Sequence, residues 1–273
     1  MKRLISILLV AVVMLMALAS CSSSDKTDWA YIEEKGTLKV GITIWKPMNY
    51  TDEDGNWTGF ETEFAQEVAK KLGVKVEFVL IDWTKKTFEL KSKTIDCVWN
   101  GMTVTDELLA EIDVSQSYIK NWQVLVIQKE NADKYTTLES MKDAKVVAEA
   151  GSAGQKAAEA DENLKNNFTS VADQKTALME VQSGTADIAI IDYVMTLSTI
   201  GPGTDYENLM LVSGIELSAE EYAIGFRKNS PETVKKVNEA MNELISSGKL
   251  NELAEKYGIA DQLISNQGVT TTD

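Results

Sequence analysis

The residues able to do chemistry are few, and the residue types that are missing limit the kind of site they could form. The chain contains no histidine, which removes the most common general base and transition-metal ligand. Cys97 lies in an apolar run, so we expect a buried, inert thiol rather than a nucleophile. The acidic run 52–54 lacks the spacing of a calcium loop and is interpreted as a solvated turn. We therefore predict no catalytic residue, no metal and no cofactor.

The other cysteine lies near the start of the chain and has a chemical context of its own. A short positive start is followed by an apolar stretch, 4–18, that is too short for a membrane span and ends in small residues, as in a secretory signal peptide. The residues up to Cys21 read Leu-Ala-Ser-Cys and match the lipobox of bacterial lipoproteins. The alternative is an ordinary signal peptide followed by a stray cysteine. We predict a signal peptide over 1–20, lipid on Cys21, and a lipid-anchored polar tether over 21–35.

The charge of the chain excludes two classes of partner. There are 27 Lys and Arg against 42 Asp and Glu, and loss of the signal peptide with Lys2 and Arg3 leaves 25, for a net charge of −17. A nucleic-acid-binding protein would carry the opposite sign. Direct adsorption to anionic lipid is also disfavoured, so we expect membrane contact through the lipid anchor alone.

The elements that must position a site alternate between strand and helix patterns. An alternating apolar pattern predicts a strand over 37–42. An apolar stripe predicts a helix that starts at Thr58 or Gly59 and ends at Gly73. The next strand is predicted over 74–80. This rhythm is typical of βαβ units, so we predict an α/β fold with mainly parallel sheets.

A second unit of the same kind begins near Trp122. Buried-strand patterns occupy 145–150 and 186–191, and Ser152 is placed to cap the helix that follows the first of them. Because no long linker separates the units, we expect two lobes joined by strands that cross between them. Ligands of open α/β sheets bind beyond the carboxyl ends of the strands, so the two sheets could share one cleft.

The ordered set of motifs resembles the solute-binding proteins of polar amino-acid ABC transporters, family 3 of the bacterial solute-binding proteins. The resemblance runs from about Gly36 to Gly258, and its strongest stretch is 96–105. The other matching segments are 36–41, 55–61, 71–78, 150–154, 184–187, Asp192 and 253–258. The family implies a two-lobed Venus-flytrap fold, of the type II periplasmic binding proteins, with two crossing hinge strands.

The resemblance also implies a division of the chain and a function. We expect lobe 1 to comprise 36–123 plus 219–262, lobe 2 to comprise 124–218, and 263–273 to form a loose tail. The protein would be a monomeric binding lipoprotein of an ABC importer, not an enzyme, in the periplasm or at the outer face of the cytoplasmic membrane. It would capture a small polar solute, an amino acid or amine-bearing relative, by lobe closure and deliver it to the permease subunits.

A set of ligand-binding residues follows from the resemblance. In the family, aromatic side chains cover the ligand, a helix start in the second lobe receives its carboxylate, and an aspartate grips its α-amino group. The matching residues in this chain are Trp45, Trp83, Asn100, Gly101, Thr103, Ser152, Ala153 and Asp192.

One position departs from the family pattern. Family members usually carry Arg at the end of a Thr-x-Glu-Arg motif, where this chain has Leu108. A guanidinium holds a carboxylate through two parallel charged hydrogen bonds, which leucine cannot make. Either another donor replaces it, from the N–H groups of 152–154 or from Lys46, Lys85 or Lys86, or the ligand lacks a standard α-carboxylate.

Several residues also have a purely structural interpretation. Asp192 precedes a helix pattern and could be its N-cap, and Thr105 is interpreted as the cap of the turn at 106–108. The remaining assignments place Trp99 and Trp122 in the core or on a lobe surface, Glu61 and Glu63 in solvent at a helix start, and Arg227, the only arginine of the mature chain, outside the cleft.

Two other functions remain open. Some relatives of this family are dehydratases, and an enzyme on the same fold would need an acid–base pair, of which the sequence shows none. A sensor or non-transport binding protein with an altered ligand would account for Leu108. Turnover of a candidate substrate would identify an enzyme. The lack of any rise in melting temperature with an amino-acid library would favour the sensor or non-transport binding protein.

Overall fold

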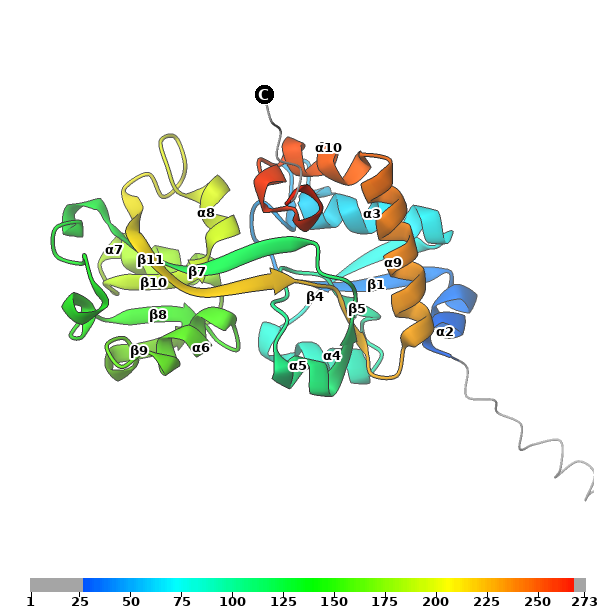
Figure 1. Ribbon diagram of the computed structural model, residues 1–273, viewed down its shortest axis with the longest axis horizontal. Helices are drawn as coiled ribbons and strands as arrows, with labels where there is room; N and C mark the ends of the chain where they lie inside the picture. The colour runs from blue at the N-terminus through cyan, green and yellow to red at the C-terminus, as the bar shows by residue number, and fades with distance from the viewer. Residues whose placement is uncertain (1–26, 268–273) are drawn as a thin grey trace, which may run out of the picture.

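The computed structural model describes residues 27–267, which form two β-sheets placed one beyond the other along the long axis of the molecule (Figure 1). In the first sheet, a parallel part is completed by antiparallel strands. Its strand order is β4 (Lys75–Leu80), β1 (Thr37–Ile42), β5 (Cys97–Val98), β12 (Gly225–Arg227) and β6 (Ile112–Val114). The hairpin of β2 (Tyr50–Thr51) and β3 (Trp57–Thr58) stands apart from this sheet.

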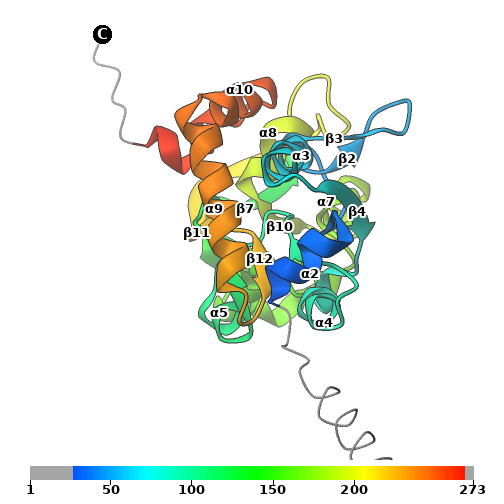
Figure 2. The same ribbon diagram turned by 90° about the vertical axis from the view of Figure 1, so that its right-hand side faces the viewer.

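Helices enclose the first sheet on both sides, and Figure 2 looks at this lobe from its end. They are α2 (Asp28–Lys35), α3 (Phe60–Leu72), α4 (Lys86–Lys91), α5 (Asp106–Glu111), α9 (Pro231–Ser246) and α10 (Lys249–Lys256). Helix α3 begins after Gly59 and ends at Gly73, as predicted, because the left-handed backbone of Gly73 suits a helix end. Phe60, Phe64 and Val68 are fully buried on its inner face.

The second sheet carries the helices of the other lobe. Its strand order is β11 (Leu209–Tyr222), β7 (Ile119–Gln128), β10 (Ile188–Asp192), β8 (Val146–Glu149) and β9 (Phe168–Val171). Helices α6 (Ala153–Ala160) and α7 (Gln174–Ser183) follow strands β8 and β9, and α8 (Tyr193–Thr199) follows β10. All residues of β8 and β10 are buried, as expected for strands that are covered on both faces.

Two long strands connect the lobes. Strands β7 and β11 pair antiparallel from Ile119 opposite Tyr222 to Gln128 opposite Leu209, with register shifts between Leu211 and Glu216 and between Glu216 and Ser218. In Figure 1 both strands extend between the second sheet and the first lobe, and they run in opposite directions. A β-bridge between Thr103 and Tyr222 holds the end of β11 against that lobe. The Venus-flytrap fold with two crossing strands is thus confirmed.

The expectation of mainly parallel sheets is only half met. Strands β4, β1 and β5 are parallel, as are β10, β8 and β9, but β12, β6, β7 and β11 pair antiparallel with their neighbours. Of these antiparallel strands, β7 and β11 carry the chain between the lobes, whereas β12 and β6 pair within the first sheet. The chain passes outward through β7 and returns through β11 and β12, so these strands meet their partners in opposite directions.

Both predicted terminal segments contain ordered structure. Within the predicted tether, 21–35, helix α2 is capped by Thr27 and packs against the first lobe. Within the predicted tail, 263–273, Leu263 is fully buried and pairs with Ile119 in a β-bridge. Residues 28–35 and Leu263 are therefore folded against the first lobe. The lobe boundaries 36–123 plus 219–262 and 124–218 stay a prediction.

Some predictions concern residues outside 27–267. The signal peptide over 1–20 and the lipid on Cys21 lie there, and the structure does not describe them. Within 27–267, no helix has the length and apolar character needed to cross a membrane. Cys97 is fully buried, and burial raises the pKa of its thiol well above the usual value, which makes it the inert cysteine that its sequence context predicts.

Candidate functional site

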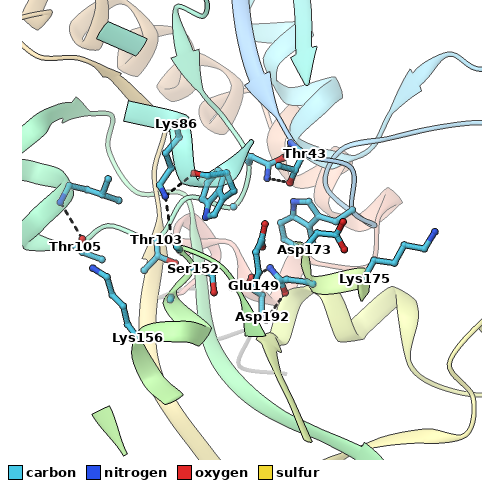
Figure 3. A pocket seen from close by; sticks show the side chains of 18 of the residues that line it. Thr43, Lys86, Thr103, Thr105, Glu149, Ser152, Lys156, Asp173, Lys175 and Asp192 are labelled. Carbon is cyan, nitrogen blue, oxygen red and sulfur yellow. Dashed lines mark hydrogen bonds between the residues drawn. The ribbon is translucent and has the colours of Figure 1, made fainter. Parts of the chain in front are cut away.

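A cavity of about 160 Å³ lies between the lobes and is lined by residues from both (Figure 3). This volume is below the roughly 300–1,000 Å³ of drug-sized ligand sites, so the site suits a small molecule. All the ligand-binding residues expected from the resemblance line it: Trp45, Trp83, Asn100, Gly101, Thr103, Ser152, Ala153 and Asp192.

Two aromatic rings form much of the wall on the first lobe. Trp45 follows β1 and is 7% exposed, and Trp83 follows β4. The ring of Trp45 lies so close to Gly101 that a Cβ there would be 2.5 Å from Trp45 Cζ2. Gly101 also has a φ of +54°, so both space and backbone conformation favour glycine at this position.

The polar groups of Asn100 and Gly101 are engaged within the protein. Asn100 Oδ1 accepts from the Thr43 N–H at 2.9 Å, and its amide donates to Thr43 Oγ1 at 2.6 Å. The Gly101 N–H donates to both carboxylate oxygens of Glu61, at 2.8 and 3.0 Å. These two residues therefore shape the cavity edge, and the Gly101 N–H is already satisfied within the protein.

The prediction that Glu61 faces solvent is wrong. Its side chain is fully buried and accepts hydrogen bonds from Asn49, Gly101 and Tyr118. Burial raises its pKa to about 7, although these hydrogen bonds lower it. Glu63 remains partly accessible and pairs with Lys256 at 2.7 Å. The first turn of α3 thus directs one carboxylate inward to support the cavity edge.

The start of helix α6 forms the facing wall on the second lobe. Ser152 caps it as predicted, because its hydroxyl accepts from the Gln155 N–H at 3.1 Å. The Gly151 N–H donates to Gln155 Oε1 at 2.7 Å. Ala153 is the first residue of the helix and lines the cavity.

Asp192 ends strand β10, is 6% exposed and lines the cavity. It occupies the N-cap position of α8, but its side chain makes no capping hydrogen bond. The Val194 N–H is bound instead by Asn121 Oδ1 at 3.1 Å. The structural interpretation of Asp192 as a helix cap is therefore wrong.

The carboxylate of Asp192 is held entirely by neutral donors. Its Oδ1 accepts from Asn121 at 2.6 Å, Gln123 at 2.8 Å and Tyr222 at 2.7 Å, and its Oδ2 accepts from Gln174. Sequence reasoning missed these four residues. Three of them come from the crossing strands β7 and β11, whose pairing could not be read from local patterns.

Glu220 on β11 shares two donors with Asp192. The side-chain amides of Asn121 and Gln123 also donate to Glu220 Oε1, at 2.5 and 2.6 Å. Burial and the nearby Asp192 carboxylate raise the pKa of Glu220 to about 8, and burial raises the pKa of Asp192 as well. The two buried acids therefore compete for the same amide groups.

Two further acids of the second lobe line the cavity and were not predicted. Glu149 is the buried last residue of β8, and Asp173 caps α7 by accepting from the Thr176 N–H at 2.7 Å. Burial, with the Asp192 and Asp173 carboxylates, raises the pKa of Glu149 to about 8. The position of Glu149 at the carboxyl end of a strand could have marked it, because ligands of open sheets bind there.

Among the lysines proposed as substitutes for the missing arginine, Lys86 lines the cavity and is nearly buried. Its ammonium donates to the carbonyls of Trp83 at 3.2 Å and Gly151 at 3.3 Å, and it lies 4.4 Å from the centre of the Trp83 ring. Burial lowers its pKa to about 8. Lys85 instead pairs with Asp82 at 3.0 Å, and Lys46 lies over the ring of Tyr50.

The other predicted positions agree with the structure. Leu108 lines the cavity, and Thr105 caps α5 by accepting from the Leu108 N–H at 3.3 Å. Trp99 is fully buried in the core, and Trp122 stacks on Tyr193. Arg227 lies outside the cleft, where it pairs with Asp28 and Asp96. Over residues 27–267, no cluster of side chains suited to a metal ion occurs.

Contacts across the mouth of the cavity bring the lobes together. Glu107 of α5 pairs with Lys156 of α6 at 2.9 Å. The Lys86 hydrogen bond to the Gly151 carbonyl also joins the first lobe to the second. Any molecule inside would therefore touch both lobes.

Known proteins resemble this chain over nearly its whole length. The model of the bacterial extracellular solute-binding proteins, family 3, matches residues 38–260. The L-cystine-binding protein TcyJ of Escherichia coli is 30% identical over 92% of this chain and 93% of its own length. The arginine-binding extracellular protein ArtP of Bacillus subtilis is 29% identical over 92% of this chain and 96% of its own length.

Solved structures show the same fold. A substrate-binding protein of an ABC uptake transporter from Streptococcus pneumoniae, with bound histidine, has a TM-score of 0.80 and 30% identity, covering 88% of this chain and 100% of that one. The ancestral amino-acid-binding protein AncCDT-1, a precursor of cyclohexadienyl dehydratase, has a TM-score of 0.75 and 31% identity. The match covers 83% of this chain and 97% of that one. The chain therefore belongs to family 3 of the bacterial extracellular solute-binding proteins.

Proposed function

We propose that this chain is the substrate-binding lipoprotein of an ABC importer, anchored outside the cytoplasmic membrane through Cys21. It captures a small amine-bearing solute, an amino acid or a relative of one, as a monomer. The observation that carries this proposal is the Asp192 carboxylate, which lines a cavity between the lobes and is surrounded only by neutral donors. Such a group is suited to bind an ammonium ion.

The proposed mechanism is lobe closure. A solute that contacts Asp192 on one lobe and the rings of Trp45 and Trp83 on the other binds the closed form better than the open form. It therefore shifts the population toward the closed form, whereas a solute that touches one lobe could not. Strands β7 and β11 are the proposed hinge, and the closed form would then dock on the permease.

Binding is proposed rather than catalysis. The similar proteins named above are binding proteins for cystine, arginine and histidine, and the dehydratase precursor is itself described as an amino-acid-binding protein. Asp192 is held by amides and a phenol. The acid beside it, Glu220, binds two of the same amides and is not part of the cavity lining, so the two acids are not both presented to a substrate as a catalytic acid and base would be.

Two measurements on purified protein test the proposal. Small molecules released by denaturation are identified by mass spectrometry, and thermal unfolding is recorded with a library of amino acids and amines. At 100 times its Kd, a ligand should raise the melting temperature by roughly 5–10 °C. No released molecule and no shift with any compound would contradict the proposal, and consumption of a library compound would identify an enzyme instead.

A further inference from the structure

The second lobe presents three carboxylates to the cavity: Glu149, Asp173 and Asp192 (Figure 3). They come from the carboxyl ends of β8 and β10 and from the cap of α7. No cationic side chain of residues 27–267 pairs with Asp192, and its Oδ2 accepts a single hydrogen bond among these residues, from Gln174, so this oxygen keeps lone-pair capacity for a ligand.

The ammonium groups that line the cavity do not balance these acids. Lys156 is paired with Glu107, and Lys86 donates to the carbonyls of Trp83 and Gly151. Lys175 is exposed, and in Figure 3 its ammonium points away from the other labelled side chains. Glu111 also lines the cavity and pairs with Lys91. Apart from the groups paired on the surface and the exposed Lys175, the described cavity lining holds three acidic groups and one ammonium.

No guanidinium reaches the cavity from the described part of the chain. The only arginine of residues 27–267, Arg227, is held by Asp28, Asp96 and the carbonyl of Ile95. Leu108, at the position where the family resemblance implies an arginine, lines the cavity with an apolar side chain. A ligand carboxylate would therefore lie beside the three acidic groups without a bidentate partner.

Besides Lys86, whose ammonium already donates to two carbonyls, the start of α6 is a place where a carboxylate could bind. Three of its backbone donors are already satisfied, because the Gly151 N–H donates to Gln155, the Ser152 N–H to the Glu149 carbonyl and the Gln155 N–H to Ser152. A carboxylate would have to use the N–H groups of Ala153 and Gly154, close to Glu149. A carboxylate bound there would lie beside Glu149 and would disfavour the ionised forms of the neighbouring acids, so it gains little from the helix start.

We infer that the solute is a small organic dication without a carboxylate, a diamine in the simplest case. One ammonium binds Asp192, the second lies with Glu149 and Asp173, and the rings of Trp45 and Trp83 cover the carbon chain. This inference rests on the proposed function, because it names the class of solute that the same cleft captures.

Calorimetry with matched pairs of ligands tests the inference. Lysine and cadaverine, ornithine and putrescine, and arginine and agmatine differ within each pair only by the α-carboxylate. At least one amine should bind at least about tenfold more tightly than its parent amino acid. Tighter binding of any amino acid than of the amines would overturn the inference and leave the proposed function standing. Failure of every amino acid and every amine to bind would overturn both.

Two substitutions test the assigned positions. Glu149→Gln should weaken diamine binding about tenfold or more. The affinity of this variant for a monoamine such as butylamine should change little. Glu162→Gln on the surface should change neither affinity. Leu108→Arg should shift preference toward the parent amino acid, and Leu109→Arg, at a position outside the cavity lining, should not. Unchanged diamine affinity in Glu149→Gln would overturn the placement of the second ammonium.

Discussion

At the scale of single residues, burial makes four carboxyl groups of this protein weaker acids. Glu61, Glu149 and Glu220 have pKa values raised to about 7, 8 and 8, and the pKa of Asp192 is raised as well. Removal from water is the first cause in each case, and nearby carboxylates add to it for the three glutamates. A cationic ligand would favour the ionised forms, so binding is expected to release protons near neutral pH.

These shifts predict how stability depends on pH. Unfolded glutamate titrates near 4.5 and folded Glu149 near 8, so the folded protein holds an extra proton between these values. Its free energy of unfolding should therefore fall as pH rises from 5 to 8, by at most about 1.4 kcal/mol per pH unit for one such group. Urea unfolding at pH 5.5 and 7.5 measures this. Glu149→Gln should reduce the change of the free energy of unfolding with pH, and Glu162→Gln should not. An equal change with pH in the wild type and in both variants would contradict the prediction.

Asp192 gives a second prediction at this scale. Asp192→Asn keeps the size of the side chain but removes the charge, so the Kd for an amine ligand should rise by a factor of roughly 30 to several thousand. Asp187→Asn, before the same strand and outside the cavity, serves as the matched control in calorimetry. An unchanged Kd in Asp192→Asn would refute the assigned role.

The sequence could predict some of these residues and not others, for physical reasons. Asp192 follows a buried strand and Ser152 precedes a helix, so local patterns mark both. Glu61 was placed in solvent because its position in a first helical turn suits an exposed acid. Its burial depends on donors from Gly101 and Tyr118, 40 and 57 residues away, and such contacts have no local pattern.

At the scale of elements, a buried cluster of ion pairs links helix α2 to the first lobe. Arg227 of β12 donates to Asp28 at 2.5 Å, to Asp96 at 2.9 Å and to the carbonyl of Ile95 at 2.5 Å, and Lys35 also pairs with Asp96. The cluster joins the segment that follows the proposed tether to the strand that returns from the second lobe. It lies away from the ligand cavity, so it should affect stability alone.

Removal of the arginine tests this assignment. Arg227→Met leaves two buried acids short of a partner and should lower the free energy of unfolding by about 3–5 kcal/mol, without changing the Kd of a cleft ligand. Lys228→Met, at the exposed neighbouring position, should lower the free energy of unfolding by less than about 1 kcal/mol. Chemical unfolding and calorimetry give the two readouts. If the Kd of a cleft ligand changes in Arg227→Met and not in Lys228→Met, the cluster contributes to ligand binding and the assignment is contradicted.

Element boundaries set by local rules were predictable, whereas pairings between distant segments were not. The ends of α3 follow from Gly59 and Gly73, and the start of α6 follows from Ser152. The antiparallel pairing of β7 with β11 joins residues up to 103 positions apart in sequence, Ile119 and Tyr222. Only the resemblance to a family implied these crossing strands, and it did not identify the side chains that they direct toward Asp192.

At the scale of the whole molecule, the Glu107–Lys156 pair across the cavity mouth should favour the closed form. Glu107→Lys places two like charges there, so ligand affinity should fall by a few-fold, and the loss should be smaller in high salt. Glu107→Lys combined with Lys156→Glu should restore affinity. Glu162→Lys, whose pair with Lys165 lies within one lobe, is the control; an equal loss in this variant would contradict a role in closure.

The central claim is that a single solute bound between the lobes holds them together, and small-angle X-ray scattering of the purified protein tests it most directly. The account predicts that a saturating ligand decreases the radius of gyration of the wild-type protein and that Asp192→Asn shows no change at the same ligand concentration. A ligand that binds with calorimetric saturation and leaves the wild-type scattering curve unaltered would contradict it.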